Sequence, residues 1–88
     1  MDVVVKRDML NIEQFARVVI YSYGLQLAQP GHVGPAFTWE ESFPSMAVGY
    51  VKSQWWMANR QERVFLKNEA KVRAIAVEVG KLIGNIVT

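Results

Sequence analysis

A chain of 88 residues without cysteine is long enough for one small domain, and it excludes both a disulfide framework and a thiolate metal site. Its composition is 51% hydrophobic, and its net charge is only +2. The chain therefore lacks the dense stripe of basic residues that a duplex DNA binder has. No apolar run approaches the roughly 20 residues that cross a bilayer, and the acidic start is unlike a signal peptide. We therefore expect a cytoplasmic domain with no membrane partner.

Residues 1–9 combine a short run of valines with several charged side chains. One strand cannot form a sheet within one chain, so we expect an extended arm here. Strand exchange between copies in an oligomer is the alternative.

The first long helix is expected over residues 12–28, ending before Pro30-Gly31. Apolar side chains at helical spacing form its predicted buried face: Ile12, Ala16, Val19, Ile20, Tyr23 and Leu27. Glu13 and Arg17 stand four residues apart on another face, where an i,i+4 ion pair is expected.

A loop rich in Pro and Gly over residues 29–37 separates this helix from the next. Thr38-Trp-Glu-Glu41 matches a capping box, in which the Thr38 hydroxyl accepts from the Glu41 amide and the Glu41 side chain reaches back to the Thr38 amide. The second helix is then expected over residues 44–59, with Pro44 at its first position.

Two faces are predicted on the second helix. Its core stripe contains Val48, Val51, Trp55 and Ala58, and a second stripe at helical spacing contains Gly49, Lys52, Trp56 and Arg60. Consecutive helical residues point about 100° apart, so Trp55 and Trp56 cannot face the same partner.

The third helix, expected over residues 61–86, is the most apolar segment, and whether it continues directly from the second stays open. The remaining segments of so short a chain can cover only part of this apolar helix. We therefore expect the protein to self-associate. Gly80 and Gly84 lower the helix propensity of this segment. We expect that close approach of another helix offsets this cost. The alternative is that the two glycines lie in a frayed end of the helix. The predicted interface between copies comprises Val72, Ile75, Val79, Gly80, Leu82, Ile83, Gly84 and Ile86.

Catalytic motifs are absent from the sequence. There is a single histidine, His32, expected to be exposed in the loop, and no Ser elbow, Walker loop or dinucleotide-binding glycine pattern occurs. Glu40 and Glu41 are adjacent, so they diverge instead of facing each other as a catalytic pair does. We expect a protein that is not an enzyme and that holds neither a metal nor a cofactor.

Aromatic and basic residues share helix faces in two places. Trp56 offers a surface on which a nucleobase stacks, and Lys52 and Arg60 can meet phosphates. Arg17 and Tyr21 on the first helix repeat this combination. We predict that these five residues bind a small anionic ligand where copies meet, and the alternative is that Trp56 belongs to the core with a solvated rim of cations.

Two segments of the chain form a recognisable combination: Ile12-Glu-Gln-Phe-Ala-Arg-Val-Val-Ile-Tyr-Ser-Tyr23, with Ala16, Arg17 and Val18, and Thr38-Trp-Glu-Glu, with Trp39. On these segments, residues 12–51 resemble a group of small phage-encoded helical proteins related to the ryanodine-receptor repeat. Some members of the wider group act as sponges that sequester the cyclic oligonucleotide signals of bacterial anti-phage defence (CBASS), as oligomers with pockets between subunits. The resemblance thus implies a phage protein in a bacterial host, an oligomer and a binding role.

The sequence as a whole predicts an all-α domain over residues 1–88, with three main helices, a long amphipathic C-terminal helix and an oligomeric state. The leading functional hypothesis is sequestration of a small anionic ligand such as a cyclic oligonucleotide. A module that inhibits a host or defence protein by direct binding is the alternative, followed by a structural assembly protein and, last, a nucleic-acid binder.

Overall fold

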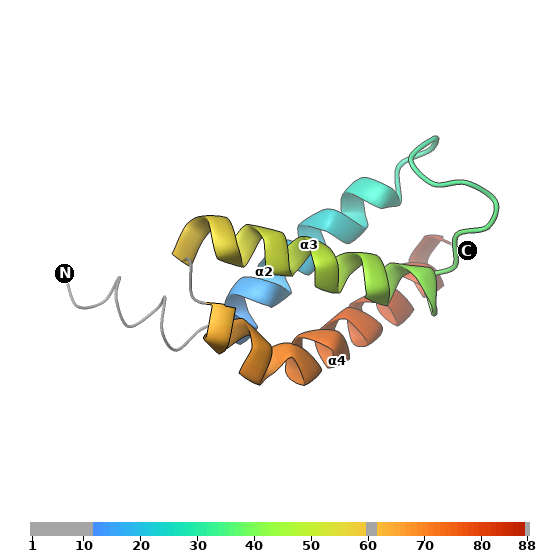
Figure 1. Ribbon diagram of the computed structural model, residues 1–88. Coiled ribbons are helices and arrows are strands. Elements are labelled where there is room, and N and C mark those ends of the chain that lie inside the picture. Colours follow the sequence, from blue (N-terminus) through green and yellow to red (C-terminus); the bar gives the residue numbers. More distant parts are fainter. Residues whose placement is uncertain (1–11, 60–61, 88) are drawn as a thin grey trace.

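Helices make up most of the described part of the chain in the computed structural model, which describes residues 12–59 and 62–87. The helices, labelled as in Figure 1, are α2 (Ile12–Leu27), α3 (Ser42–Asn59) and α4 (Glu62–Val87). No strand occurs among these residues, which confirms the all-α prediction for them. The predicted arm at residues 1–9 lies outside the described residues.

The three helices lie alongside one another with alternating direction (Figure 1). Phe15 near the start of α2 contacts Trp55 near the end of α3, and Tyr23 near the end of α2 contacts Phe43 near the start of α3. α2 and α3 are therefore antiparallel, and α4 returns antiparallel to α3. The second and third predicted helices are thus two separate elements that pack against each other.

Thr38 caps the turn that leads into α3. Its hydroxyl accepts hydrogen bonds from the amides of Glu41 (3.1 Å) and Ser42 (3.2 Å). The reciprocal bond comes from a different residue than predicted, because the Thr38 amide donates to Ser42 Oγ at 3.2 Å. Pro44 is the third residue of α3 and not the first. Proline is tolerated there because the amides of the first turn have no partner within the helix.

Salt bridges connect α2 to α4, and the predicted pair within α2 does not form. Glu13 lies 3.4 Å from Lys71, and Arg17 lies 3.8 Å from Glu78. α2 and α4 run parallel and side by side, so each side chain meets an opposite charge on the neighbouring helix. All four groups are well exposed, so each pair contributes at most about 1 kcal/mol.

One hydrophobic core lies between the three helices. Its buried side chains come from every helix: Ile12, Ala16, Ile20 and Leu27 of α2; Phe43, Ala47, Val48, Val51 and Trp55 of α3; Phe65, Val72, Ile75, Ala76, Val79 and Ile83 of α4. The predicted core stripes of α2 and α3 therefore largely face inward, with Val19 and Tyr23 half-buried at the edge.

The apolar side of α4 is covered within a single chain. Helices α2 and α3 bury most of the residues assigned to an interface between copies: Val72, Ile75, Val79, Gly80 and Ile83. That assignment is corrected, and these residues belong to the core of one chain. Helical spacing shows that a face is buried but does not show which partner buries it. Leu82 and Ile86 remain 45% and 74% exposed, and self-association through them stays a prediction.

Three glycines allow the start of α3 to pack closely on its neighbours. A Cβ on Gly80 would lie 2.6 Å from the Trp39 carbonyl oxygen and 3.0 Å from the Phe43 ring, and one on Gly84 would lie 3.0 Å from Trp39 Cβ. A Cβ on Gly24 would lie 3.2 Å from Phe43 Cζ. The close approach predicted for Gly80 and Gly84 is therefore present, and the neighbour is a segment of the same chain.

Replacing Gly80 by Ala is expected to lower the free energy of unfolding by about 1–3 kcal/mol, because the new methyl group overpacks against Trp39. Gly49→Ala is the matched control, since a Cβ there meets nothing within 4 Å. It should raise the free energy of unfolding by about 0.5–1 kcal/mol through helix propensity alone. Urea denaturation measures both, and equal stabilisation by the two variants would contradict the close contact.

Candidate ligand-binding site

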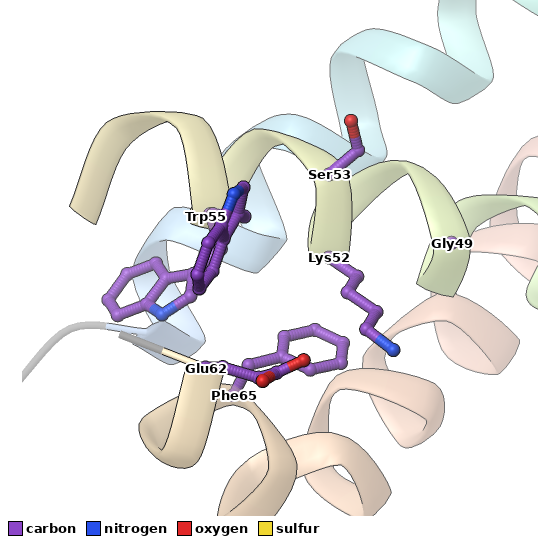
Figure 2. Close-up of a pocket in the computed structure, with 7 residues that line it drawn as sticks. Gly49, Lys52, Ser53, Trp55, Glu62 and Phe65 are labelled. Carbon is purple, nitrogen blue, oxygen red and sulfur yellow. The ribbon is translucent and has the colours of Figure 1, made fainter. Parts of the chain in front are cut away.

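A cavity of about 380 Å³ opens between the second half of α3 and the first turn of α4 (Figure 2). Small-molecule sites in proteins usually measure about 300–1,000 Å³, so its size suits a small ligand. Its lining combines aromatic rings with charged and hydroxyl groups: Gly49, Lys52, Ser53, Trp55, Trp56, Glu62 and Phe65. Such a wall offers ring stacking and polar contacts to one ligand.

The two adjacent tryptophans differ in burial, as their positions on a helix predict, but both line this cavity. Trp55 is 1% exposed, and its ring meets Phe15 edge-on with centroids 5.2 Å apart. Trp56 is 51% exposed, although it also lines the cavity. Burial of an indole ring stabilises a folded protein. The exposed part of the Trp56 ring is not buried by folding, so it remains free to stack on a ligand.

Opposite charges approach the cavity from its two walls. Lys52 extends from α3 towards α4, and the Glu62 carboxylate lies on the α4 side (Figure 2). The salt bridges among the described residues join other side chains, so these two are not paired with each other. Both charges therefore remain available to a ligand.

The structure brings together only part of the predicted binding set. Lys52 and Trp56 line the same cavity, as their spacing of four residues on α3 predicts. Arg17 and Tyr21 lie on α2 away from it, where Arg17 pairs with α4 and Tyr21 packs half-buried against the core. Arg60 lies outside the described residues. Within one chain the predicted five-residue site is therefore not assembled.

Four residues of the cavity were not predicted to line it: Ser53, Trp55, Glu62 and Phe65. Ser53 adjoins the Lys52–Trp56 stripe and could have been included. Glu62 and Phe65 belong to the first turn of α4, and only the antiparallel packing of α3 and α4 brings them opposite Lys52. Sequence spacing within one helix contains no signal for that placement.

A second hollow of about 490 Å³ lies at the opposite end of the bundle, lined by Thr38, Trp39, Glu40, Gly80, Lys81, Gly84 and Asn85. The Trp39 ring lies 4.9 Å from the Phe37 ring and 5.1 Å from the Phe43 ring, and it packs on Gly84. Because this indole is already held by packing, it offers less free surface than Trp56. The α3–α4 cavity is the better candidate site.

The outer face of α2 and α3, defined by Val18, Ser22, Met46, Tyr50, Gln54 and Met57, contains no charged side chain. A shallow hollow connects Val18 and Ser22 of α2 to Tyr50 and Gln54 of α3. Val18 and Met57 are 66% and 72% exposed. An uncharged surface with aromatic and methionine side chains is typical of the centre of a protein interface.

Tyr23 and Tyr50 stack where α2 meets α3, with centroids 4.5 Å apart and ring planes 13° apart. Burial raises the pKa of Tyr23 above its ordinary value of 10.0, and the neighbouring Tyr50 raises it further. The folded state therefore favours the neutral phenol.

Stability should fall as the pH rises above about 10. A group whose pKa is raised by folding contributes fully below its unfolded-state pKa and loses that contribution as the pH passes its folded-state pKa. Tyr23→Phe should therefore show a smaller loss of stability between about pH 9 and pH 12, measured by urea denaturation. Tyr50→Phe should reduce the loss less, since burial is the larger cause of the shift. An unchanged slope in Tyr23→Phe would contradict this.

Neither a metal site nor a membrane span is found in the part of the chain that the structure describes. No three His, Asp or Glu side chains gather there as metal ligands do, and His32 is exposed in the loop after α2 as predicted. None of α2, α3 and α4 is both long enough and apolar enough to cross a bilayer.

No protein-family model, no curated protein and no solved structure matches this chain. The resemblance of residues 12–51 to phage ryanodine-receptor-repeat-like proteins therefore stays a prediction.

Proposed function

We propose that this protein binds and sequesters a small anionic ligand that carries an aromatic ring, without catalysing a reaction on it. The observation that carries the proposal is the half-exposed Trp56 indole, which lines a cavity together with unpaired Lys52. A phage protein that removes cyclic oligonucleotide immune signals of its bacterial host is the specific role we favour.

The chemistry of the cavity supports such a ligand. Stacking of a nucleobase on an aromatic side chain contributes about 1–3 kcal/mol, and it tolerates every base because each has a π-face. The Lys52 ammonium can meet a phosphate. A cavity of about 380 Å³ suits one base with its adjoining sugar and phosphate, so the remainder of a cyclic oligonucleotide would extend beyond it.

The test is a titration of the protein with a panel of cyclic oligonucleotides. A binding ligand should quench tryptophan fluorescence and raise the melting temperature, because it stabilises the folded form by mass action. Lys52→Met should weaken binding and reduce its dependence on salt, while keeping the aliphatic part of the side chain. Absence of any response across the panel would remove this function.

A second candidate function is protein binding through the outer face of α2 and α3. The partner we propose is a second copy of this chain. In a two-fold symmetric dimer the same surface of both copies meets, so charged residues in it would face like charges. A surface without charged residues avoids that repulsion. Between Val18 and Asn59 the charged residues are only Glu40, Glu41 and Lys52, and none of them belongs to this face.

Light scattering after size-exclusion chromatography tests this interface. Val18→Glu and Met57→Glu place charge on well-exposed positions of the outer face and should convert an oligomer to a monomer. Leu66→Glu, on the exposed side of α4, adds the same charge elsewhere and should leave the mass unchanged. A monomeric wild-type protein would exclude the second copy and favour the alternative, inhibition of a host or defence protein by direct binding.

A further inference from the structure

Glu62 is the feature of the cavity that binding of an anion does not explain. Its carboxylate lies on the α4 wall, opposite Lys52, and it is not paired with that lysine. An acidic side chain at the start of a helix suits the exposed amides of the first turn. Its place on the cavity wall nevertheless puts a negative group in the same cavity as the Trp56 indole.

A carboxylate only accepts hydrogen bonds, and its two oxygens can accept from two adjacent donors. Guanine presents such a pair on one edge, the ring N1–H and the exocyclic N2–H₂. Adenine presents one amino donor beside N1, which is an acceptor, so its lone pair would face a carboxylate oxygen. An unpaired acceptor at that position disfavours binding.

We infer that the cavity selects a guanine nucleotide, with Glu62 accepting from the guanine edge, Trp56 stacking on the base and Lys52 meeting phosphate. This inference rests on the proposed binding function and adds the class of base. The cavity wall has one acidic side chain, Glu62, and one basic side chain, Lys52. A guanine nucleotide matches both, because its base offers hydrogen-bond donors and its phosphate is negatively charged. Stacking on Trp56 alone would not distinguish the bases, so Glu62 provides the selectivity.

Isothermal titration of the full chain with GMP and with AMP tests the inference. The wild-type protein should bind GMP at least about tenfold more tightly than AMP, as expected for one bidentate contact. Glu62→Gln replaces one carboxylate oxygen with an amide donor, which no longer matches the two adjacent guanine donors N1–H and N2–H₂ and which matches the amino group and N1 of adenine. The ratio of the dissociation constant for AMP to that for GMP should therefore fall to about one or below one in that variant.

Glu69→Gln is the matched control, because it removes the same charge from α4 at a residue that does not line the cavity. It should keep the wild-type preference for GMP. Equal affinity for GMP and AMP in the wild-type protein, or a preference unchanged by Glu62→Gln, overturns the guanine inference while the binding function stands. Absence of binding of either nucleotide and of every cyclic oligonucleotide overturns both.

Discussion

Trp55→Ala should lower the free energy of unfolding by about 3–5 kcal/mol, whereas Trp56→Ala should change it by about 1 kcal/mol or less and weaken ligand binding by about tenfold or more. Trp55 is almost fully buried against Phe15, so its removal leaves a large void in the core. Trp56 is half-exposed, so its removal mainly takes away the stacking surface of the cavity. Urea denaturation gives the stabilities, and fluorescence titration gives the binding.

In the stability measurement each of the two tryptophan variants is the control for the other, because they remove the same side chain from neighbouring positions of α3. Trp56→Phe adds a further comparison and should retain part of the affinity, since a phenyl ring also stacks on a base. Equal loss of stability in both alanine variants would show that Trp56 belongs to the core. Full retention of binding in Trp56→Ala would remove its proposed role.

Phe43→Ala should also lower the free energy of unfolding by about 3–5 kcal/mol, a large fraction of the total for a domain of this size. The Phe43 ring is 0% exposed and contacts Tyr23 and Trp39, with centroids 6.1 Å and 5.1 Å away. It also fills the space left by Gly24 and Gly80, so the variant opens a void where all three helices meet. Urea denaturation monitored by circular dichroism measures the loss.

Leu66→Ala is the control for Phe43→Ala, because Leu66 is 51% exposed on α4. Its effect should stay within about 0.5 kcal/mol, as for most surface substitutions. A loss below about 1 kcal/mol in Phe43→Ala would contradict its place at the junction of the helices.

The helices could be predicted because their local signals are strong. The spacing of Ile12, Ala16 and Ile20 indicates α2, and the Thr38 hydroxyl marks the approach to α3. The predicted ends agree with the structure to within about two residues, which is the usual uncertainty of helix boundaries. These features depend on neighbours in the sequence, so the sequence suffices for them.

The interface assignment was wrong for buried residues of α4 because it depended on distant parts of the chain. Val72 and Val79 are apolar enough for either a core or an oligomer, and the pattern is the same in both cases. Gly80 shows the same limit, since its partner, Trp39, is far away in sequence. The amount of cover that α2 and α3 provide follows from three-dimensional packing.

The candidate site could be predicted only on one helix. Lys52 and Trp56 share a face of α3, so their proximity follows from helical spacing. Glu62 and Phe65 reach the same cavity through the antiparallel packing of α4, which no spacing within the sequence specifies. The residue that we infer to select the base therefore became visible only in the structure.

Nuclear magnetic resonance tests most directly the central claim that the α3–α4 cavity binds a small aromatic anion. The ¹⁵N-labelled protein would be titrated with a guanine-containing cyclic dinucleotide while backbone amide shifts are followed. We predict the largest changes at residues 49–56 and 62–65, which contain the cavity lining. An unchanged spectrum, or changes confined to the outer face of α2 and α3, would contradict the account.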